Sequence, residues 1–476
     1  MSKLFINGQF VDASSGRTIK VLNPANESVL AEVAEATEKD ADAAVKAARA
    51  ALDGKWGATA PSERARLMLK AADLMEAKLD EFVALETANC GKTLFESKVE
   101  IRLSIEILRY YAGWTTKVTG ETLPSGPGAF LYTLREPVGV VAAITPWNFP
   151  LLLSMWKFGP ALATGNTVVH KPASLTPMTA LKFAEVVQAA GFPEGVFNVV
   201  PGPGSTVGQS LVTHPGVDKV AFTGDSSTGK GIMKLCADGL KKVSLELGGK
   251  SPNIVFADAD LKGASGGAIG AIFYNKGEVC AAGSRLFVEE SVKDELLAAI
   301  TERAKKTTVG DPLDKNTRMG PVISKGQLDK VLSYVDSAKS EGAKLVHGGD
   351  RPANLTKGYY VNPTIFSDVK NSMKIAREEI FGPVLSVLTF KDVSDVVAQA
   401  NDSMYGLAAA VWSKDIKKAH KVARAVKAGT VWINTYNQYD AALPFGGTKQ
   451  SGFGRELGRE ALDQYTQTKS VWVDLS

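Results

Sequence analysis

The sequence predicts an α/β protein built on two doubly wound sheets, and three observations support this fold class. Short apolar runs alternate with helical segments from about residue 137 to 247, and a second alternation runs from about 251 to 433. Ala, Leu, Glu and Lys recur with helical periodicity through residues 38–118. The 476 residues are enough for roughly two to four domains. Because strands that alternate with helices form parallel sheets, we expect two α/β domains.

In chain order, the predicted elements begin and end with strands. Residues 5–23 predict a strand pair joined by a turn through Ser14 and Gly16. A Pro- and Gly-rich segment at 124–128 precedes the first α/β unit. The strands of this unit are predicted at 138–146, 166–172, 196–202, 219–224 and 242–249. Residues 119–136 and the last segment, TQTKSVWVDLS, predict β structure outside both α/β units.

Composition argues against several classes of protein. The net charge is only +4 and no long run of Lys or Arg occurs, which disfavours nucleic acid as a partner. The three cysteines contain no CxxC pair, and such a sparse set fits a reducing compartment. The N-terminus lacks the apolar core of a signal peptide, and no apolar run of about 18 residues predicts a membrane span. We therefore expect a cytoplasmic protein with no membrane partner.

The histidines give no sign of a metal site. His170, His214, His347 and His420 show no ligand spacing, so we expect no metal. His170 lies in the apolar run NTVVHKP and is expected to be a hydrogen-bonded, partly buried side chain.

Two motifs resemble catalytic signatures but lack essential parts. Gly224–Lys230 matches most of a P-loop, yet residue 231 is Gly where the metal-binding Ser or Thr belongs. A Gly-rich turn that leads into a helix still offers free N–H groups to a dinucleotide pyrophosphate. Residues 263–267 spell GxSxG, but a nucleophile elbow needs a strand before the serine, and this segment predicts a small-residue helix.

Three side chains are stronger catalytic candidates. Cys280 stands among small residues that make a poor core but permit the close approach of a substrate. Glu246 ends an apolar strand just before two glycines, and Asn148 follows another strand within PWNFP. Strand ends in open α/β sheets are where ligands bind. A buried structural role is the alternative for each residue taken singly.

Together these segments resemble the aldehyde dehydrogenase superfamily over essentially the whole chain, with the motifs in family order. The Glu246-to-Cys280 spacing (280 − 246 = 34) also fits. The resemblance is to the tetrameric, hydrolytic group. The motifs are PWNFP (146–150), KPA (171–173), FTG (222–224), LELGGK (245–250), the Cys280 segment, EEIFGPV (378–384) and PFGGTKQSGFGRE (444–456).

The resemblance implies a role for each matching residue. Cys280 is expected to be the nucleophile and Glu246 the general base, with Asn148 and the Cys280 N–H as oxyanion donors. Lys157 is expected near the cofactor and the proton path. The expected cofactor residues are Ile144, Thr145, Pro146, Trp147, Lys171, Ser174, Gly204, Gly208, Phe222, Thr223, Gly224, Asp225, Leu247, Glu379 and Phe381. The expected substrate tunnel is Phe149, Leu152, Leu153, Trp156, Tyr274, Val279, Tyr439 and Phe445.

The family resemblance also implies the domain organisation. We expect a Rossmann-like cofactor domain from residues 1–118 and 137–247 and an α/β catalytic domain from 248–449. A small β arm from 119–136 and 450–476 is expected to pair with a partner, giving a homotetramer.

The sequence departs from the common family pattern at two positions. Ser174 stands where strict NAD users often carry a Glu that repels a 2′-phosphate, so either NAD or NADP is expected. The alternative is that Ser174 merely ends the turn after Pro172. Asp225 stands where a small hydroxyl residue is common, and an anion near a pyrophosphate is unfavourable unless it caps the helix.

The reaction expected is oxidation of an aldehyde to its acid through a Cys thiohemiacetal and thioester. The apolar tunnel favours an aromatic or medium-chain aliphatic aldehyde, with a broad-specificity detoxifying enzyme as the alternative. A non-catalytic binding protein and a CoA-acylating dehydrogenase are rival hypotheses. The presence of Cys280, Glu246 and Asn148 disfavours the first, and Glu246 disfavours the second.

Overall fold

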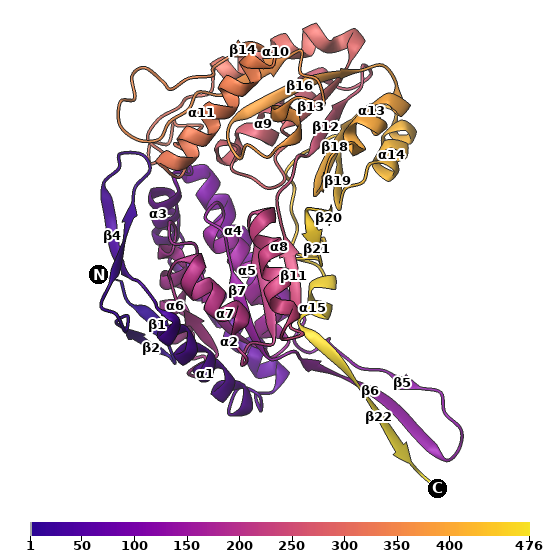
Figure 1. The fold of residues 1–476 in the computed structure, drawn as a ribbon. Coiled ribbons are helices and arrows are strands. Elements are labelled where there is room, and N and C mark those ends of the chain that lie inside the picture. The colour runs from indigo at the N-terminus through magenta and orange to yellow at the C-terminus, as the bar shows by residue number, and fades with distance from the viewer. Residues whose placement is uncertain (1) are drawn as a thin grey trace.

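The computed structural model describes residues 2–476 and confirms an α/β fold with two mixed sheets and a small β arm (Figure 1). In Figure 1 the first domain lies below the second, and the arm projects away from both. Within residues 2–476, no helix is long and apolar enough to cross a membrane.

The first domain is built on a sheet that is parallel at its centre. Its strands are β1 (Leu4–Ile6), β2 (Gln9–Val11), β7 (Val140–Ile144), β8 (Thr167–Lys171), β9 (Phe197–Val199), β10 (Lys219–Thr223), β11 (Lys242–Glu246) and β21 (Gly452–Phe453). They lie in the order β2-β1-β9-β8-β7-β10-β11-β21. Neighbours among β9, β8, β7, β10 and β11 pair in parallel. At the edges, β1, β2 and β21 pair antiparallel.

Side-chain alternation along β7 divides the first domain into two core layers. Val140, Ala142 and Ile144 belong to the core against one set of helices, and Val141 and Ala143 to the core against the other. The first set is α1 (Glu38–Asp53), α7 (Gln209–Thr213) and α8 (Ser226–Ala237), with the π-helical turn η1 (Gly204–Gly208) before α7. The second set is α2 (Pro61–Ala77), α3 (Leu79–Cys90), α4 (Leu94–Ala112), α5 (Pro150–Ala163) and α6 (Met178–Ala190).

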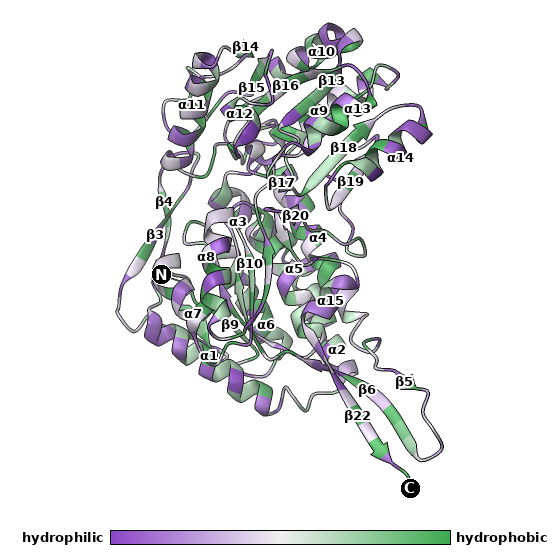
Figure 2. Cartoon of the chain, turned by 45° about the vertical axis from the view of Figure 1, so that its right-hand side comes forward, coloured by the Kyte–Doolittle hydropathy of each residue, from purple (hydrophilic) through white to green (hydrophobic). Residues whose placement is uncertain are grey.

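The second domain repeats the α/β plan. Its strands are β12 (Pro252–Val255), β13 (Arg285–Glu289), β14 (Lys344–His347), β15 (Thr364–Ser367), β16 (Val384–Phe390), β18 (Ala408–Trp412) and β19 (Thr430–Ile433). They lie in the order β14-β15-β16-β13-β12-β18-β19, and only β14 is antiparallel to its neighbour in this part of the described chain. Its helices are α9 (Leu261–Phe273), α10 (Lys293–Lys305), α11 (Lys325–Ser340), α12 (Lys374–Arg377), α13 (Val393–Asn401) and α14 (Ile416–Ala425), with short turns η2 (Tyr274–Gly277) and η3 (Glu290–Val292). In Figure 2, β10 and β18 are hydrophobic, whereas α14 is largely hydrophilic.

The predicted strand pairing within residues 5–23 is wrong. β1 pairs with β2 through a tight turn, and β3 (Thr18–Leu22) pairs with β4 (Val29–Ala34) instead. Asn7 and Gly8, with φ angles of 51° and 75°, make the turn. Two successive left-handed residues are what a two-residue hairpin requires, so the chain reverses at Asn7 and not at Ser14.

The arm is a ribbon of β5 (Thr122–Leu123), β6 (Ala129–Pro137) and β22 (Thr466–Asp474). β22 pairs with β6 along its full length, from Thr466 opposite Pro137 to Asp474 opposite Ala129. Residues 450–465, expected with the arm, instead contribute β21 to the first sheet and the short helix α15 (Glu460–Gln464). β17 (Tyr405–Gly406) and β20 (Thr448–Lys449) form a small separate ladder near the domain junction.

Candidate active site

The strand order of the first sheet creates a switch point between β7 and β10. The chain passes from β7 outward to β8 and β9, and then returns to the other side of β7 to form β10 and β11. The connections after β7 and β10 therefore diverge, which opens a crevice beyond the carboxyl ends of these strands. Residues 145–148 and 224–225, which follow the two strands, line this crevice.

The second domain closes the crevice from the opposite side. Glu246 ends β11, and residues 247–251 lead directly to the first residue of β12. Cys280 lies shortly before β13, and Glu379 lies shortly before β16. The amino ends of the second sheet thus face the carboxyl ends of the first, and both domains supply side chains to one site.

Two cavities occupy the crevice. The inner cavity, of about 220 Å³, is lined by Pro146, Trp147, Asn148, Thr223, Gly224, Asp225, Glu246, Gly248, Cys280, Gln327, Lys330, Glu379 and Phe381. The outer cavity, of about 450 Å³, is lined by Ile144, Thr145, Pro146, Trp147, Lys171, Ala173, Gly204, Gly208, Gln209, Val212, Phe222, Thr223, Gly224, Asp225, Thr228, Gly231, Ile232 and Leu235. Of the residues predicted to hold the cofactor, Ser174 and Leu247 line neither cavity.

Cys280 and Glu246 share the inner cavity in a strongly desolvated setting. Burial, reinforced by the carboxylates of Glu246 and Glu379, raises the pKa of the Cys280 thiol well above its usual range. Burial also raises the pKa of Glu246 to about 8, with the Glu456 carboxylate adding to the effect. Both Glu246 oxygens lack a hydrogen-bond partner within the described chain. A buried carboxylate in this state can accept a proton once the pH passes about 8.

Asn148 is oriented by the turn that precedes the cysteine. Its Nδ2 donates to the backbone oxygen of Glu278 at 2.9 Å. Asn275 Nδ2 donates in turn to the backbone oxygens of Asn148 and Glu278, at 2.9 and 3.2 Å. In residues 2–476, Asn148 Nδ2 donates to the Glu278 backbone oxygen alone, and Asn148 Oδ1 has no hydrogen-bond partner.

The turn before Cys280 has an unusual backbone. Asn275, Lys276 and Gly277 all have left-handed φ angles, of 45°, 56° and 71°. A Cβ at Gly277 would lie 2.2 Å from the Gly382 backbone oxygen, so only glycine fits there. The turn is held by contacts to other elements, which is how such a conformation persists.

Those contacts come from separate parts of the chain. The Asn275 N–H donates to Glu96 Oε1 on α4 at 2.6 Å. The Glu278 carboxylate accepts from the Ile323 N–H at 2.9 Å and pairs with Lys276 at 3.1 Å. The turn before Cys280 therefore joins α4, the loop after β7 and the second domain.

Lys157 lies behind the inner cavity, on α5. Its Nζ donates to Thr223 Oγ1 and to Glu456 Oε1, both at 2.6 Å, and its side chain is fully buried. The Lys157 ammonium opposes the rise in the pKa of Glu246. The structure thus places Lys157 between a cavity-lining hydroxyl and a second buried carboxylate.

Close contacts explain the two glycines after Glu246. The Gly249 N–H donates to Glu379 Oε1 at 3.0 Å, and a Cβ at Gly248 would lie 2.4 Å from Glu379 Oε2. Gly248 therefore lets the carboxylate approach the backbone, whereas a Cβ at Gly249 would lie 2.3 Å from the Cys280 backbone oxygen. Burial raises the pKa of Glu379 to about 7, although the hydrogen bond from the Gly249 N–H acts to lower it.

Besides Gly248, sequence reasoning missed Gln327 and Lys330 of the inner cavity. Both lie on α11 of the second domain. Gln327 Nε2 donates to the backbone oxygen of Phe381 at 2.6 Å and so holds that left-handed residue (φ 61°) in place. No local motif marks either residue, because their position depends on how α11 packs near β16.

Lys171 and Ser174 converge on one carbonyl at the outer cavity. Lys171 Nζ donates to Pro172 O and Gly202 O, at 2.9 and 3.0 Å. Ser174 Oγ also donates to Gly202 O, at 3.0 Å. Ser174 lies inside the turn that the bond from Thr176 N–H to Ala173 O closes, whereas its neighbour Ala173 lines the cavity.

A third hollow, the entrance cavity, contains part of the predicted substrate tunnel. Phe149, Leu152, Tyr274 and Tyr439 line it, together with Trp412 and residues on α4 and α9. The other predicted tunnel residues, Leu153, Trp156, Val279 and Phe445, are buried. The Trp156 ring packs 5.2 Å from the ring centre of Phe445 and 6.1 Å from that of Tyr439, so these residues support the aromatic wall.

The structure also settles the remaining motifs. Ser265 lies within α9 and donates to the Lys262 backbone oxygen, so the GxSxG is a helix, as predicted. Lys230 donates to Gln450 Oε1 at 2.8 Å and lines neither crevice cavity. His170 is fully buried and bonds to Thr145 Oγ1 at 2.8 Å, and burial lowers its pKa well below the usual range.

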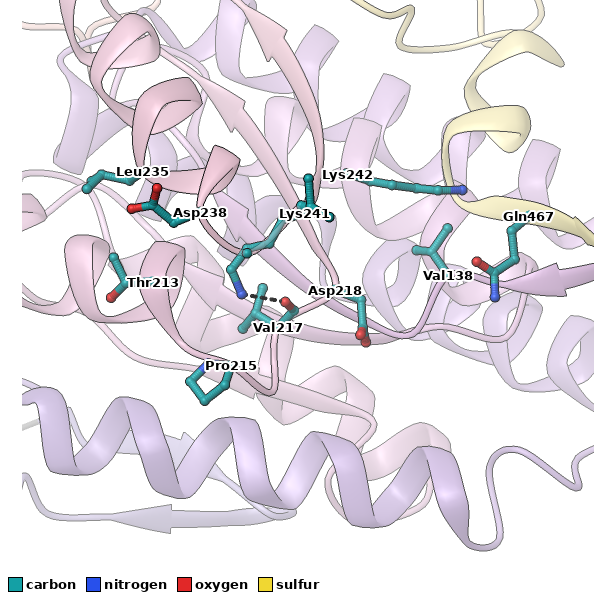
Figure 3. A pocket seen from close by; sticks show the side chains of 12 residues that line it. Val138, Thr213, Pro215, Val217, Asp218, Leu235, Asp238, Lys241, Lys242 and Gln467 are labelled. Atoms are coloured by element: carbon teal, nitrogen blue, oxygen red, sulfur yellow. Dashed lines mark hydrogen bonds between the residues drawn. The ribbon is translucent and has the colours of Figure 1, made fainter.

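Another hollow lies at the opposite edge of the first sheet (Figure 3). It is bordered by Asp218 and Lys242, at the amino ends of β10 and β11, and by Gln467 of the arm. Lys241 Nζ donates to the Val217 backbone oxygen at 2.7 Å. The lining contains no cysteine or histidine, and it lies away from the carboxyl ends where Glu246 and Asn148 lie. Among the residues described, no group of three or more His, Cys, Asp or Glu could hold a metal ion.

Comparison with known proteins shows to which family the chain belongs. The aldehyde dehydrogenase family matches residues 10–471, almost the whole chain. The chain belongs to the aldehyde dehydrogenase family. It is an NAD(P)-dependent oxidoreductase that converts an aldehyde to its carboxylic acid.

Relatives of known sequence and structure agree with this assignment. The DhaS protein of Bacillus subtilis is 51% identical over 475 residues, covering 99% of this chain and 96% of that protein. Aldehyde dehydrogenase 1A1 of Mesocricetus auratus is 50% identical, covering 100% and 95%. The NAD+ complex of the Bacillus cereus aldehyde dehydrogenase superposes with a TM-score of 0.98 at 51% identity, covering 100% of this chain and 97% of that one.

Proposed function

We propose that this dehydrogenase oxidises its aldehyde through a thiohemiacetal and then a thioester on Cys280. Glu246 acts as the general base, and Asn148 Nδ2 and the Cys280 backbone N–H act as oxyanion donors. The observation that carries the proposal is the inner cavity, where these three residues arrive from separate segments around one space. A thiol, an unpaired buried carboxylate and an oriented amide are the groups that this chemistry needs.

The first half of the reaction forms the thioester. Glu246 takes the proton of the Cys280 thiol and releases it to solvent before the second half of the reaction, and the thiolate adds to the aldehyde carbon. The resulting oxyanion accepts hydrogen bonds from Asn148 Nδ2 and the Cys280 N–H, which are already fixed in place. When bound, an oxidised nicotinamide supplies a positive field that favours the thiolate and then accepts the hydride. Loss of hydride from the tetrahedral carbon restores the carbonyl as a thioester.

The second half hydrolyses the thioester. Glu246 takes a proton from a water molecule, which attacks the thioester carbon. The tetrahedral intermediate expels the Cys280 thiolate and leaves the carboxylic acid. Lys157 is proposed to lie on the path by which this proton moves on, since it joins Thr223 at the cavity wall to buried Glu456.

The crevice fits a dinucleotide cofactor. A Cβ at Gly204 or Gly231 would meet no atom within 4 Å, so these cavity-lining glycines leave room for a ligand. Lys171 at the outer cavity and Glu379 at the inner cavity are proposed to bind the two riboses. The B. cereus enzyme and a betaine aldehyde dehydrogenase of Staphylococcus aureus (TM-score 0.99, 42% identity, 100% and 95% covered) are both described in complex with NAD+.

We expect Ser174 to permit the use of NADP beside NAD. Ser174→Glu should lower kcat/KM for NADP by about tenfold or more, because a carboxylate a few ångströms from a 2′-phosphate repels it by roughly 1–4 kcal/mol. NAD should be used as well as before or better, and the change should lie mainly in KM. Initial rates with both cofactors measure this.

Ser174→Ala is the matched control. An unchanged NADP-to-NAD ratio in the Glu variant would show that Ser174 only ends the turn.

The substrate is proposed to be an aromatic or medium-chain aliphatic aldehyde. Support comes from the aromatic side chains of the entrance cavity, such as Phe149, Tyr274 and Tyr439. We expect kcat/KM for benzaldehyde and hexanal to exceed that for succinic semialdehyde, since an apolar wall disfavours a second carboxylate. Cofactor reduction over this panel tests the proposal. Equal rates would instead favour a broad-specificity enzyme, and a preference for the semialdehyde would contradict the proposal.

We also propose a homotetramer located in the cytoplasm. The arm exposes Phe130, Leu134 and Trp472 on strands β6 and β22. An exposed strand edge with apolar side chains favours pairing with another chain, and the mass in light scattering tests this. The location remains a prediction from the sparse cysteines.

A further inference from the structure

The two crevice cavities share a set of residues. Both the inner and the outer cavity are lined by Pro146, Trp147, Thr223, Gly224 and Asp225. A dinucleotide whose adenosine lies in the outer cavity and whose nicotinamide lies in the inner one must pass these residues at its middle. The middle of a dinucleotide is its pyrophosphate. Asp225 is therefore a carboxylate on the route of two phosphate groups.

Asp225 already occupies the anion site that a helix would offer there. It is the N-cap of α8, and its Oδ1 accepts from the N–H groups of Ser227 and Thr228 at 2.8 and 3.1 Å. The same oxygen also accepts from Ser227 Oγ at 2.5 Å. A free helix N-terminus binds phosphate through these N–H groups and the helix dipole. At α8 these N–H groups are already bonded to the Asp225 carboxylate.

The side chain is charged at neutral pH. Burial opposes its ionisation, but the bonds from Ser227 and Thr228 outweigh burial and hold the pKa of Asp225 below its usual range. Two other ionisable groups line the inner cavity with it. Lys330 is near enough to help lower the pKa of Asp225, whereas Glu379 is a second acid whose own pKa the Asp225 charge raises.

We propose that Asp225 is a built-in anion at the pyrophosphate position, which weakens the binding of the dinucleotide and speeds its release. The proposal rests on the proposed function in one respect, that the crevice binds a dinucleotide across both cavities. Because the reduced cofactor must leave before the next turnover, a weaker grip on the pyrophosphate favours exchange. The cofactor is then held mainly at its two ends, by the outer cavity and by the residues around Glu379.

The test distinguishes the negative charge of Asp225 from its role as the N-cap of α8. Asp225→Asn keeps the shape and remains a good N-cap, so α8 stays formed while the charge is lost. We expect the variant to bind NAD and ADP about fivefold tighter or more, because one repulsion from each phosphate is removed. Adenosine, which has no phosphate, should bind equally to both proteins. Calorimetry without aldehyde measures all three affinities, so turnover plays no part.

Salt gives an independent readout. Raising the ionic strength screens repulsion between partly exposed charges. The difference in ADP affinity between parent and variant should therefore shrink as salt is added.

A matched control is available at α14. Asp415 caps that helix with the same pattern, accepting from Lys417 and Lys418 N–H at 2.9 and 3.1 Å, and it lines neither crevice cavity. Asp415→Asn should leave ADP affinity unchanged. Equal or weaker ADP binding by Asp225→Asn, or an equal gain for adenosine, would overturn the proposal. A parent protein that binds ADP but oxidises no aldehyde would count against the proposed function, and the ADP comparison would still decide the role of Asp225.

Discussion

Cys280→Ser should lose aldehyde oxidation by about a thousandfold or more while it still folds and binds NAD. A serine hydroxyl yields far less of the anionic nucleophile than a thiol does. The inner cavity contains the acidic residues Asp225, Glu246 and Glu379 but lacks a histidine to activate an alcohol. Steady-state formation of reduced cofactor measures the loss, and NAD titration confirms that the crevice is intact.

Cys236→Ser is the matched control for this substitution. Cys236 is a buried cysteine on α8 that lies outside the inner cavity, so its replacement should leave turnover within a few fold of the parent. Turnover by Cys280→Ser within about tenfold of the parent would contradict a covalent role for Cys280.

Glu246→Gln should give a burst of reduced cofactor and then stall as the thioester. Without the carboxylate, no side chain at this position deprotonates water, and steady-state turnover should fall by about a hundredfold or more. Intact-mass measurement after aldehyde addition should show the acyl adduct on the protein. The adduct should disappear if Cys280 is also replaced.

The pH profile provides a second readout for the same residue. Burial raises the pKa of Glu246 to about 8, so the proton-accepting form increases as the pH rises through that value. Deacylation by the parent should therefore increase from neutral pH to above about 8, and the Gln variant should lose this increase. Glu378→Gln, which changes a carboxylate outside the inner cavity, is the control. Unchanged steady-state turnover in Glu246→Gln would show that another group activates the water.

Much of the fold could be predicted from the sequence because its signals are local. Strands β7, β8, β9 and β10 of the first domain are each an apolar run followed by a helical period, and burial on both faces produces that pattern. The first hairpin was missed although Asn7-Gly8 carried the signal. An Asn-Gly pair between short strands specifies a tight turn more strongly than the Ser- and Gly-rich segment that follows it.

The site could be predicted only where it coincides with motifs. Asn148, Glu246 and Cys280 each occur in a recognisable segment, and the structure brings all three to one cavity. Gln327 and Lys330 reach the same cavity from a helix whose sequence resembles any amphipathic helix. The contact of Asn275 with Glu96 spans 179 positions, and no local pattern encodes it.

The turn before Cys280 also affects how the chain folds during its synthesis. Asn275 of this turn is held by Glu96 and by the Asn148 backbone oxygen from the first domain, and Glu278 is held by Ile323 from the second. A nascent chain that ends before Ile323 can make the contacts with the first domain but lacks the one with the second. The complete set of contacts beside Cys280 therefore forms only after the second domain has been synthesised and has folded onto the first. Correct placement of this cysteine is thus tied to the completion of both domains.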